Sequence, residues 1–227
     1  MLTVHVTGNL READLGGSPR ALPPADPVMM QAVLRQLATR CPAGYRASYE
    51  VTHHGPTDLR TPSFFVEIGS TEKEWVDESA GHAVALSVLA ATPVDAIPLI
   101  GFAGNHYAAR QTEIALTSRG AFGHIAHSRE AGSLDDAMIR MMQEKTGAVA
   151  AYIDKKAIAK EELHQLILQL GALGIVRLTG SEISDMGALS WATFCTARAL
   201  AGTLFPGARC HVHAMEREGQ LELVRID

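Results

Sequence analysis

Apolar and polar positions follow one another along the chain in a pattern that predicts strands separated by amphipathic helices. Strands are expected over residues 2–6, 45–52, 63–69, 97–102, 111–116, 121–125, 148–153 and 175–178. Helices are expected over 27–41, 71–90, 134–145, 158–170 and 188–200, and strands 211–215 and 220–226 are expected to form a closing hairpin. Strands that alternate with helices of this length are typical of an α/β fold, here three-layer α/β/α with a mixed, mostly parallel sheet.

Local signals support several of these boundaries. Asp26-Pro27 is typical of an N-cap followed by proline at the first helical position. Thr71-x-x-Glu74 is a capping-box pattern that indicates a helix start. Residues 8–27 are rich in glycine and proline and predict a long loop, a kind of segment that is usually functional or mobile. We find no internal repeat and expect a single α/β domain over residues 1–227.

The composition is that of an ordinary globular protein, with 47% hydrophobic and 20% charged residues. The apolar runs are too short to cross a membrane, and the first residues lack the pattern of a signal peptide. The three cysteines are scattered without a CxxC spacing, which argues against a disulfide framework. These features favour a cytoplasmic protein with no membrane partner. The formal net charge of -5 does not favour a general polyanion binder.

Two neighbouring segments place polar residues where packing alone would not. His53-His54 stands between the predicted strand 45–52 and a Gly55-Pro56 turn. Glu67 lies inside the apolar strand 63–69, where a carboxylate is costly unless it is paired or bound. Loops that follow strands often carry functional groups. The two segments therefore predict one part of an active site.

Two later segments carry histidines in comparable positions. His106 follows the apolar strand 97–102, and His124 lies at the end of the strand 121–125. In open α/β sheets, ligands bind beyond the carboxyl ends of the strands. We therefore expect a group of side chains from distant segments to converge, namely His53, His54, Glu67, His106 and His124.

Such a group has two chemical interpretations. Imidazole and carboxylate groups are zinc ligands, and a zinc with an open position lowers the pKa of bound water and polarises a carbonyl. The same residues could act without a metal, with His54, Glu67 or His106 as a general base. No HExxH motif or other diagnostic metal spacing decides between these two possibilities.

Structural explanations stay open beside the functional ones. A histidine in a loop is often only solvated, and Glu67 could form a buried ion pair with Arg110. Residues 101–104 could serve a tight turn or admit a substrate closely. Amides at Ser70 and Thr71 could simply begin a helix or could hold an anion. The histidines expected to be structural or on the surface are His5, His82, His127, His164, His211 and His213.

The motifs together resemble the archaeal and plant type of D-aminoacyl-tRNA deacylase over residues 1 to about 156. They are LTVH at 2–5, THHGPT at 52–57, FVEIGS at 65–70, G-x-HYA-x-R at 104–110 and GHI at 123–125, with Gly8-Asn9, Gly16-Gly17 and Trp75. The resemblance implies a fold related to peptidyl-tRNA hydrolases and nucleoside phosphorylases. It also implies hydrolysis of the ester between a D-amino acid and tRNA, in translation quality control, with zinc as cofactor.

The pattern residues of that family fall on the five side chains expected to converge. From this set we expect His53, His54, Glu67, His106 and His124 as metal ligands and His54, Glu67 and His106 as catalytic groups. Substrate binding is expected at Gly104, Asn105, Tyr107, Arg110, Ser70 and Thr71.

The sequence departs from the family pattern in three places. The family normally has a βα region before the LTVH strand, at which this chain starts. Ala103 and Asn105 stand where the family tends to have glycine, and Ala109 stands where it tends to have proline. The C-terminal part, residues 175–227, matches no motif of the family.

A tRNA partner has to be reconciled with the negative net charge, because phosphate contacts supply much of nucleic-acid affinity. We expect only the acceptor end to be held, by a monomer with a local basic rim formed by Arg11, Arg20, Arg60 and Arg110. Two other functions stay open. One is a metallohydrolase of a small ester or amide with no RNA, and the other is a non-catalytic RNA-binding remnant.

Overall fold

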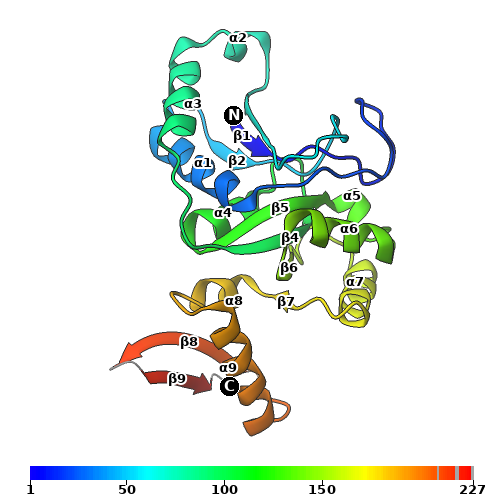
Figure 1. Cartoon of the computed structure of the whole chain (residues 1–227), viewed down its shortest axis with the longest axis vertical. Helices are drawn as coiled ribbons and strands as arrows, with labels where there is room; N and C mark the ends of the chain where they lie inside the picture. Colours follow the sequence, from blue (N-terminus) through cyan, green and yellow to red (C-terminus); the bar gives the residue numbers. More distant parts are fainter. Residues whose placement is uncertain (209, 218–219, 226–227) are drawn as a thin grey trace.

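The computed structural model describes residues 1–208, 210–217 and 220–225 (Figure 1). The strands are β1 (Leu2–His5), β2 (Ala47–Tyr49), β3 (Phe65–Ile68), β4 (Ile97–Gly104), β5 (Gly120–His127), β6 (Ala150–Ile153), β7 (Arg177–Leu178), β8 (Cys210–Arg217) and β9 (Gln220–Arg225). The helices are α1 (Pro27–Arg40), α2 (Glu72–Trp75), α3 (Glu78–Ala90), α4 (Ala109–Thr117), α5 (Ser128–Ala131), α6 (Asp136–Thr146), α7 (Lys160–Ala172), α8 (Gly180–Asp185) and α9 (Trp191–Leu204).

The strands of the main body form two adjoining sheets. One is wholly parallel with the order β5-β4-β6-β7. The other has the order β2-β1-β3, in which β1 runs parallel to β2 and antiparallel to β3. The amide of Thr52, just after β2, donates a hydrogen bond of 2.8 Å to the carbonyl of Ile125 in β5 and so connects the two sheets. The mixed, mostly parallel arrangement predicted from the sequence is confirmed.

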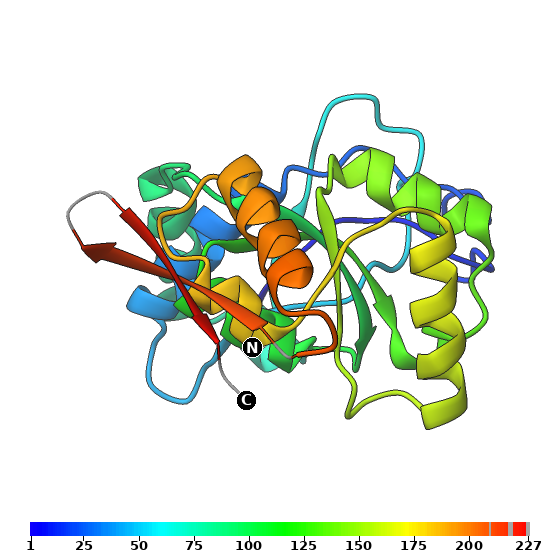
Figure 2. The same ribbon diagram turned by 90° about the horizontal axis from the view of Figure 1, so that it is seen from below.

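Both faces of the parallel sheet are buried. Leu99 of β4 belongs to a core shared with α1, whereas the next residue, Ile100, belongs to a second core shared with α6 and α7. Tyr152 and Ile153 of β6 divide between the two cores in the same way. Because successive strand residues point to opposite faces, the sheet lies between two layers of helices. Figure 2 shows α6 and α7 on one side of the strands and α1 and α9 on the other, which confirms the three-layer α/β/α architecture.

Side-chain caps explain where the early helices begin. Asp26 accepts a hydrogen bond from the amide of Met29, and Pro27 occupies the first turn of α1 as expected. The predicted helix 71–90 is two helices instead of one. Asp77 accepts hydrogen bonds from the amides of Ser79 and Ala80 and thereby starts α3 immediately after the short α2.

The strand predicted over 111–116 is wrong, because this segment forms most of α4. Its buried residues are Gln111, Thr112, Ile114 and Ala115, a spacing that places one face of a helix against the sheet. The hydroxyl of Thr112 bonds to the carbonyl of Ala108 and also accepts the amide of Tyr49. Packing of this segment against β2 as a helix therefore outweighs the β-propensity of its threonine and isoleucine residues.

The last part of the chain packs below the parallel sheet in the view of Figure 1. Helix α8 and helix α9 both contact β8, which pairs antiparallel with β9. The hairpin predicted from the sequence is confirmed as β8 and β9, while residues 218, 219 and 226 of that prediction lie outside the described residues. Within the described ranges, no helix has the length and apolar character that a membrane span requires.

Candidate active site

Six polar side chains from four segments meet at one end of the β2-β1-β3 sheet. His5 closes β1, Glu67 lies in β3, Glu50 follows β2 directly, and His106 belongs to the loop after β4. His53 and His54 complete the group from the segment after β2. We call these six residues the histidine cluster: His5, Glu50, His53, His54, Glu67 and His106.

Glu50 is the centre of one half of the cluster. One carboxylate oxygen, Oε2, lies 3.5 Å from His53 Nε2, 3.5 Å from His106 Nε2 and 3.7 Å from His5 Nδ1. The side chain of Glu50 is only 7% exposed. A carboxylate this deeply buried is costly unless it is paired or bound to a cation, and its neighbours here are three imidazole rings.

His5, His54 and Glu67 form the other half. The Nε2 atoms of His5 and His54 are 3.2 Å apart, and Glu67 Oε1 lies 3.7 Å from His54 Nε2 and 4.0 Å from His5 Nε2. His5 is opposite Phe65 in the antiparallel pair, so Glu67, two residues on, points to the same face. Strand pairing therefore brings this carboxylate to the imidazoles.

Backbone carbonyls set the tautomers of the two adjacent histidines. His53 Nδ1 donates to the carbonyl of Val51 at 2.7 Å, and His54 Nδ1 donates to the carbonyl of Gly55. With the proton on Nδ1, the neutral ring presents an unprotonated Nε2. Both Nε2 atoms therefore offer lone pairs to the interior of the cluster.

The environment favours neutral imidazoles. Burial, together with the nearby His53, His54 and His106, lowers the pKa of His5 to about 2. Burial also lowers the pKa of His53, against the opposing effect of its bond to the Val51 carbonyl. Neutral imidazole is the form that binds metal ions, so these rings are ready to act as ligands near neutral pH.

The ligand atoms of the cluster fit a metal ion. Three sets have ligand atoms within 4.8 Å of one another: His5-His53-His54, Glu50-His53-His106 and His5-Glu50-Glu67. Two nitrogens bound to one tetrahedral zinc at ~2.0–2.1 Å would be roughly 3.3 Å apart, close to the observed separation of the Nε2 atoms of His5 and His54. Nδ1 of His5 is buried without a hydrogen-bond partner, as expected of a cluster shaped for a further ligand.

The backbone of the histidine segment is held in an uncommon conformation. His54 has φ +46°, in the left-handed region that few non-glycine residues adopt. The next residue, Gly55, passes very close to the glycine-rich loop: a Cβ there would lie 2.6 Å from Gly17 N and 2.8 Å from Gly16 C. Only glycine allows this approach, so the Gly55-Pro56 turn and the loop fix one another.

Hydrogen bonds hold the long loop over the cluster. The amide of Gly8 donates to the carbonyl of His54 at 2.8 Å, and the hydroxyl of Thr7 donates to the carbonyl of Pro56 at 2.7 Å. The side-chain amide of Asn9 donates within the loop to the carbonyl of Gly16 at 2.8 Å. The loop predicted over 8–27 is therefore an ordered wall of the site.

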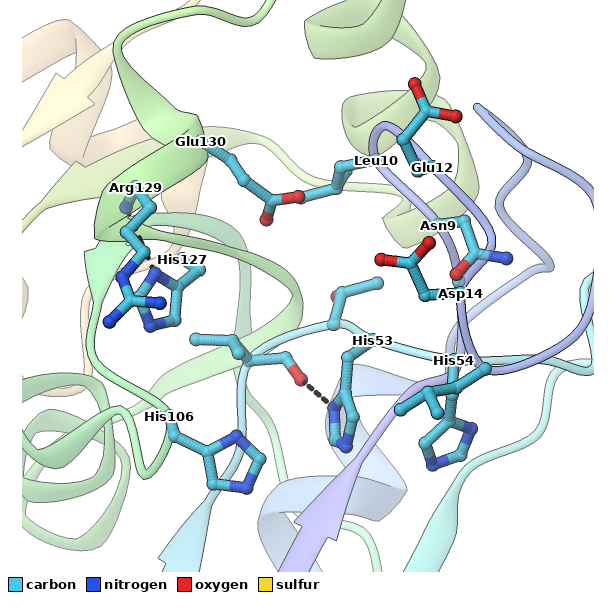
Figure 3. Close-up of a pocket in the computed structure, with 14 residues that line it drawn as sticks. Asn9, Leu10, Glu12, Asp14, His53, His54, His106, His127, Arg129 and Glu130 are labelled. Atoms are coloured by element: carbon cyan, nitrogen blue, oxygen red, sulfur yellow. Dashed lines mark hydrogen bonds between the residues drawn. The ribbon is translucent and has the colours of Figure 1, made fainter.

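A cavity of about 410 Å³ opens above the histidines. Figure 3 shows His53, His54 and His106 along one side of it and the carboxylates of Glu12 and Glu130 on the side away from these rings. Asp14, His127 and Arg129 also line the cavity. Burial raises the pKa of Glu130. The cavity thus combines a histidine floor with a largely acidic wall.

Comparison with known proteins decides the family. A sequence model of the family described as D-aminoacyl-tRNA deacylase matches residues 1–176. The chain belongs to the D-aminoacyl-tRNA deacylase family. The resemblance seen in the motifs is confirmed, and the match extends beyond residue 156, where the recognisable motifs end.

Relatives named D-aminoacyl-tRNA deacylase are similar over the whole chain. The protein from Methanoregula boonei is 58% identical over 100% of this chain and 52% of its own length. The protein from Methanoculleus marisnigri is 54% identical over 99% of this chain and 52% of its own length. The chain therefore spans about half the length of these curated relatives. Residues 175–227, which carry no recognisable motif, are included in the match to the Methanoregula boonei protein.

A solved structure supports the fold of this deacylase-family chain. The crystal structure of a conserved protein of unknown function is similar with a TM-score of 0.74 and 33% sequence identity. The similarity covers 81% of this chain and 67% of that one. An α/β architecture of this kind is thus seen in a related chain.

Four of the five residues that were expected to converge lie in the histidine cluster. The fifth, His124, lies outside it. His124 is fully buried, with Nδ1 3.1 Å from the hydroxyl of Thr52 and Nε2 3.0 Å from the carbonyl of Pro23. Both ring nitrogens are occupied, and burial lowers the pKa of His124 to about 4. His124 is a support beneath Thr52, and the expectation that it joins a metal site is corrected.

Ser70 and Thr71 lie away from the cavity. The carbonyl of Gly69, the residue before Ser70, accepts a hydrogen bond of 2.6 Å from the amino group of Met1. Met1 precedes β1, so this contact lies at the end of the strand opposite to His5. From Met1 to His5 the strand advances by four residues, which is roughly 13 Å. The amide of Thr71 already donates to Glu74 at 3.0 Å, so it is not free for phosphate. The expectation that Ser70 and Thr71 bind the substrate is therefore corrected.

The remaining residues expected to bind substrate surround the cavity without lining it. Gly104 ends β4, and Asn105 and Tyr107 flank His106 in the following loop. The ring of Tyr107 packs edge-on to His106 with centroids 4.9 Å apart. Arg110 forms an ion pair with Glu113, not with Glu67. Of these residues, Tyr107 supports the ring of His106.

Two of the four arginines of the expected basic rim are neutralised by ion pairs. Arg20 pairs with Asp135 at 2.7 Å, and Arg110 pairs with Glu113. Arg11 donates to the hydroxyl of Ser133, at 3.4 Å. The arginine that does line the cavity is Arg129, which the sequence patterns did not single out.

Two members of the cluster, His5 and Glu50, were missed from the sequence. Glu50 stands in the predicted strand 45–52, three residues before His53, and a carboxylate in that position is the same signal that identified Glu67. His5 lies in a strand whose four residues are all buried, which a short alternating pattern at the start of a chain does not indicate.

Proposed function

We propose that this chain carries the hydrolytic centre for the ester bond of D-aminoacyl-tRNA, releasing a free D-amino acid and tRNA. The observation that supports the proposal most strongly is the convergence of six imidazole and carboxylate side chains on the floor of a cavity. Family membership adds the substrate class, since relatives that are about twice as long are named D-aminoacyl-tRNA deacylase.

Hydrolysis of an ester needs a water that gives up a proton as it attacks the acyl carbon. Glu50 and Glu67 provide carboxylates on the two halves of the cluster, and the lone pairs of His53 and His54 point between them. His106 is 52% exposed while its Nε2 contacts Glu50, so it can pass a proton between the buried carboxylate and solvent.

Zinc is the cofactor we infer, with His5, His53 and His54 as one ligand set and Glu50 and His106 as further ligands beside His53. When bound, zinc would lower the pKa of a coordinated water and polarise an acyl carbonyl. Glu67 is 38% exposed and lies within 4 Å of both His5 and His54, a position suited to hold or accept a proton beside that set.

The charge of the cavity suits the aminoacyl end of the substrate. The acidic wall of Glu12, Asp14 and Glu130 repels phosphate but accommodates the ammonium group of an amino acid ester. Arg129, the neighbour of Glu130 in α5, provides positive charge for the nearest phosphate. We therefore infer that only the acceptor end enters, that the protein works as a monomer, and that it acts in the cytoplasm, where charged tRNA is used.

The direct test is a comparison of D- and L-aminoacyl-tRNA carrying the same amino acid. We expect the D-ester to be hydrolysed faster by at least tenfold, and a strong zinc chelator to abolish the rate. Equal hydrolysis of both esters, or no hydrolysis of the D-ester, would contradict the proposal. A heat-treated sample controls for the spontaneous hydrolysis of these esters.

The net charge of -5 and the acidic wall favour one other candidate, a metallohydrolase of small esters. The two candidates differ in salt dependence, because phosphate contacts weaken steeply with ionic strength. For a tRNA enzyme, kcat/KM falls when salt is raised and when Arg129 is replaced. For a small-ester enzyme, an aminoacyl ester without tRNA is hydrolysed just as well, and Arg129→Gln has little effect on KM.

A further inference from the structure

His127 stands beside the histidine cluster but is not part of it. It is the last residue of β5 and pairs in register with Gly104, after which the chain turns into the loop of His106. Its side chain is half-buried and lines the cavity together with Arg129 (Figure 3). It therefore faces the space in which an acyl group would lie, from a wall other than that of His53 and His54.

The local backbone sets the tautomer of this ring. His127 is the N-cap of α5, and its Nδ1 accepts a hydrogen bond of 3.0 Å from the amide of Arg129. The hydroxyl of Ser128 also lies 3.5 Å from the same nitrogen. A nitrogen that accepts an amide hydrogen carries no proton, so the proton of the neutral ring is on Nε2.

This arrangement leaves an N–H group without a protein partner. In the described part of the chain, no hydrogen bond reaches Nε2 of His127. A neutral imidazole whose other nitrogen is held at a helix start can serve as an electrophile that donates to a carbonyl oxygen. Donors placed where negative charge develops are among the largest contributions to acyl-transfer catalysis.

We propose that His127 donates a hydrogen bond from Nε2–H to the acyl oxygen of the ester, as a catalytic residue of the hydrolysis. The role rests on the proposed function. Water adds to the acyl carbon and loses a proton to the histidine cluster, while the carbonyl electron pair moves to the oxygen that His127 contacts. The carbonyl then reforms, the bond to the ribose oxygen breaks, and that oxygen takes up a proton. The products are the free amino acid and tRNA.

Two substitutions separate this role from helix capping. Serine and asparagine both cap helices well, so His127→Ser and His127→Asn should keep the bond to the amide of Arg129 and an unchanged Tm. Of the two, only asparagine also presents an N–H group, on an Nδ2 atom that lies nearer the backbone than Nε2 of histidine. We expect His127→Ser to lose about 100-fold in kcat with KM within threefold of wild type, and His127→Asn to recover part of that loss.

A purely structural role would leave kcat of His127→Ser within twofold of wild type, which would overturn the proposal. Nitrogen NMR of the labelled imidazole gives a second readout that does not depend on activity: the proton is expected on Nε2 at neutral pH, and a proton on Nδ1 would overturn the assignment. If the wild-type protein had no deacylase activity, both the proposed function and this role of His127 would be contradicted. If the wild type were active and His127→Ser equally active, only the role of His127 would be contradicted.

Discussion

The Nε2 atoms of His5 and His54 lie 3.2 Å apart in the centre of the cluster. His54 donates through Nδ1 to the carbonyl of Gly55, so its Nε2 is unprotonated. His5 must then donate through its own Nε2, which leaves its buried Nδ1 without a partner, or both lone pairs must share a cation. With a shared cation, the proton of neutral His5 lies on Nδ1, 3.7 Å from the carboxylate oxygen Oε2 of Glu50, and for this reason we propose the metal at this position.

His53, like His5 and Glu50, belongs to two of the three ligand sets, so its removal should weaken zinc binding. We expect His53→Ala to weaken zinc affinity by at least 100-fold, measured by titration calorimetry on protein first stripped of metal. Because a ligand that binds only the folded state raises its stability, zinc should also raise the Tm of wild type but not of this variant.

The matched control is His164→Ala, because the side chain of His164 is exposed on α7, outside the cluster. This variant should bind zinc as wild type does. Unchanged affinity in His53→Ala, or an equal loss in both variants, would exclude the cluster as the metal site.

Gly55→Ala should disturb the site through the backbone. The new methyl group would meet the backbone of Gly16 and Gly17 at less than 3 Å, so the glycine-rich loop must move away from the histidines. We expect a loss of about 1–3 kcal/mol in the free energy of unfolding and a large loss of deacylation. Denaturant unfolding and single-turnover kinetics measure the two effects.

Gly171→Ala provides the comparison, since nothing lies within 4 Å of a Cβ at that position of α7. It should stabilise the protein by about 0.5–1 kcal/mol, as expected for alanine over glycine in a helix, with activity unchanged. If Gly55→Ala were as stable and active as wild type, the loop would not be fixed by this close approach.

His124 should make stability depend on pH. Its folded-state pKa of about 4 is below the ordinary value of 6.5, so between these values the unfolded chain binds a proton that the folded chain does not. The free energy of unfolding should therefore fall as pH decreases from 6.5 to 4, by roughly 3 kcal/mol from this group. Above pH 6.5 the ring is neutral in both states and contributes no pH dependence.

Denaturant unfolding of wild type and His124→Gln across that range checks the prediction. The glutamine variant should show a shallower slope between pH 6.5 and 4, while His82→Gln, whose side chain is exposed on α3, should behave as wild type. Parallel curves for wild type and His124→Gln would contradict the account of His124 as a buried, neutral support.

The sequence allowed the fold class to be predicted because the strands that carry it are strongly apolar. β4 and β6 are buried on both faces, and such strands stand out in any chain. The segment that became α4 did not stand out. Its conformation depends on the contact of Thr112 with β2, which is distant in sequence.

The site was predicted only in part, for a similar reason. His53, His54, Glu67 and His106 stand in motifs next to strand ends, where the chain order itself suggests convergence. His124 looked equivalent, but whether a buried histidine faces a cavity or a hydroxyl such as that of Thr52 is set by three-dimensional packing. Glu50 carried a usable signal, namely a carboxylate three residues before a histidine pair.

The central claim is that the histidine cluster performs the hydrolysis, and Glu50 tests it most directly. Glu50→Gln keeps the size of the side chain but removes the charge that His5, His53 and His106 share. The measurement is the single-turnover rate of D-aminoacyl-tRNA hydrolysis, with tRNA affinity followed in parallel. The account predicts a loss of at least 100-fold in rate at unchanged tRNA affinity, whereas a rate within twofold of wild type would contradict it.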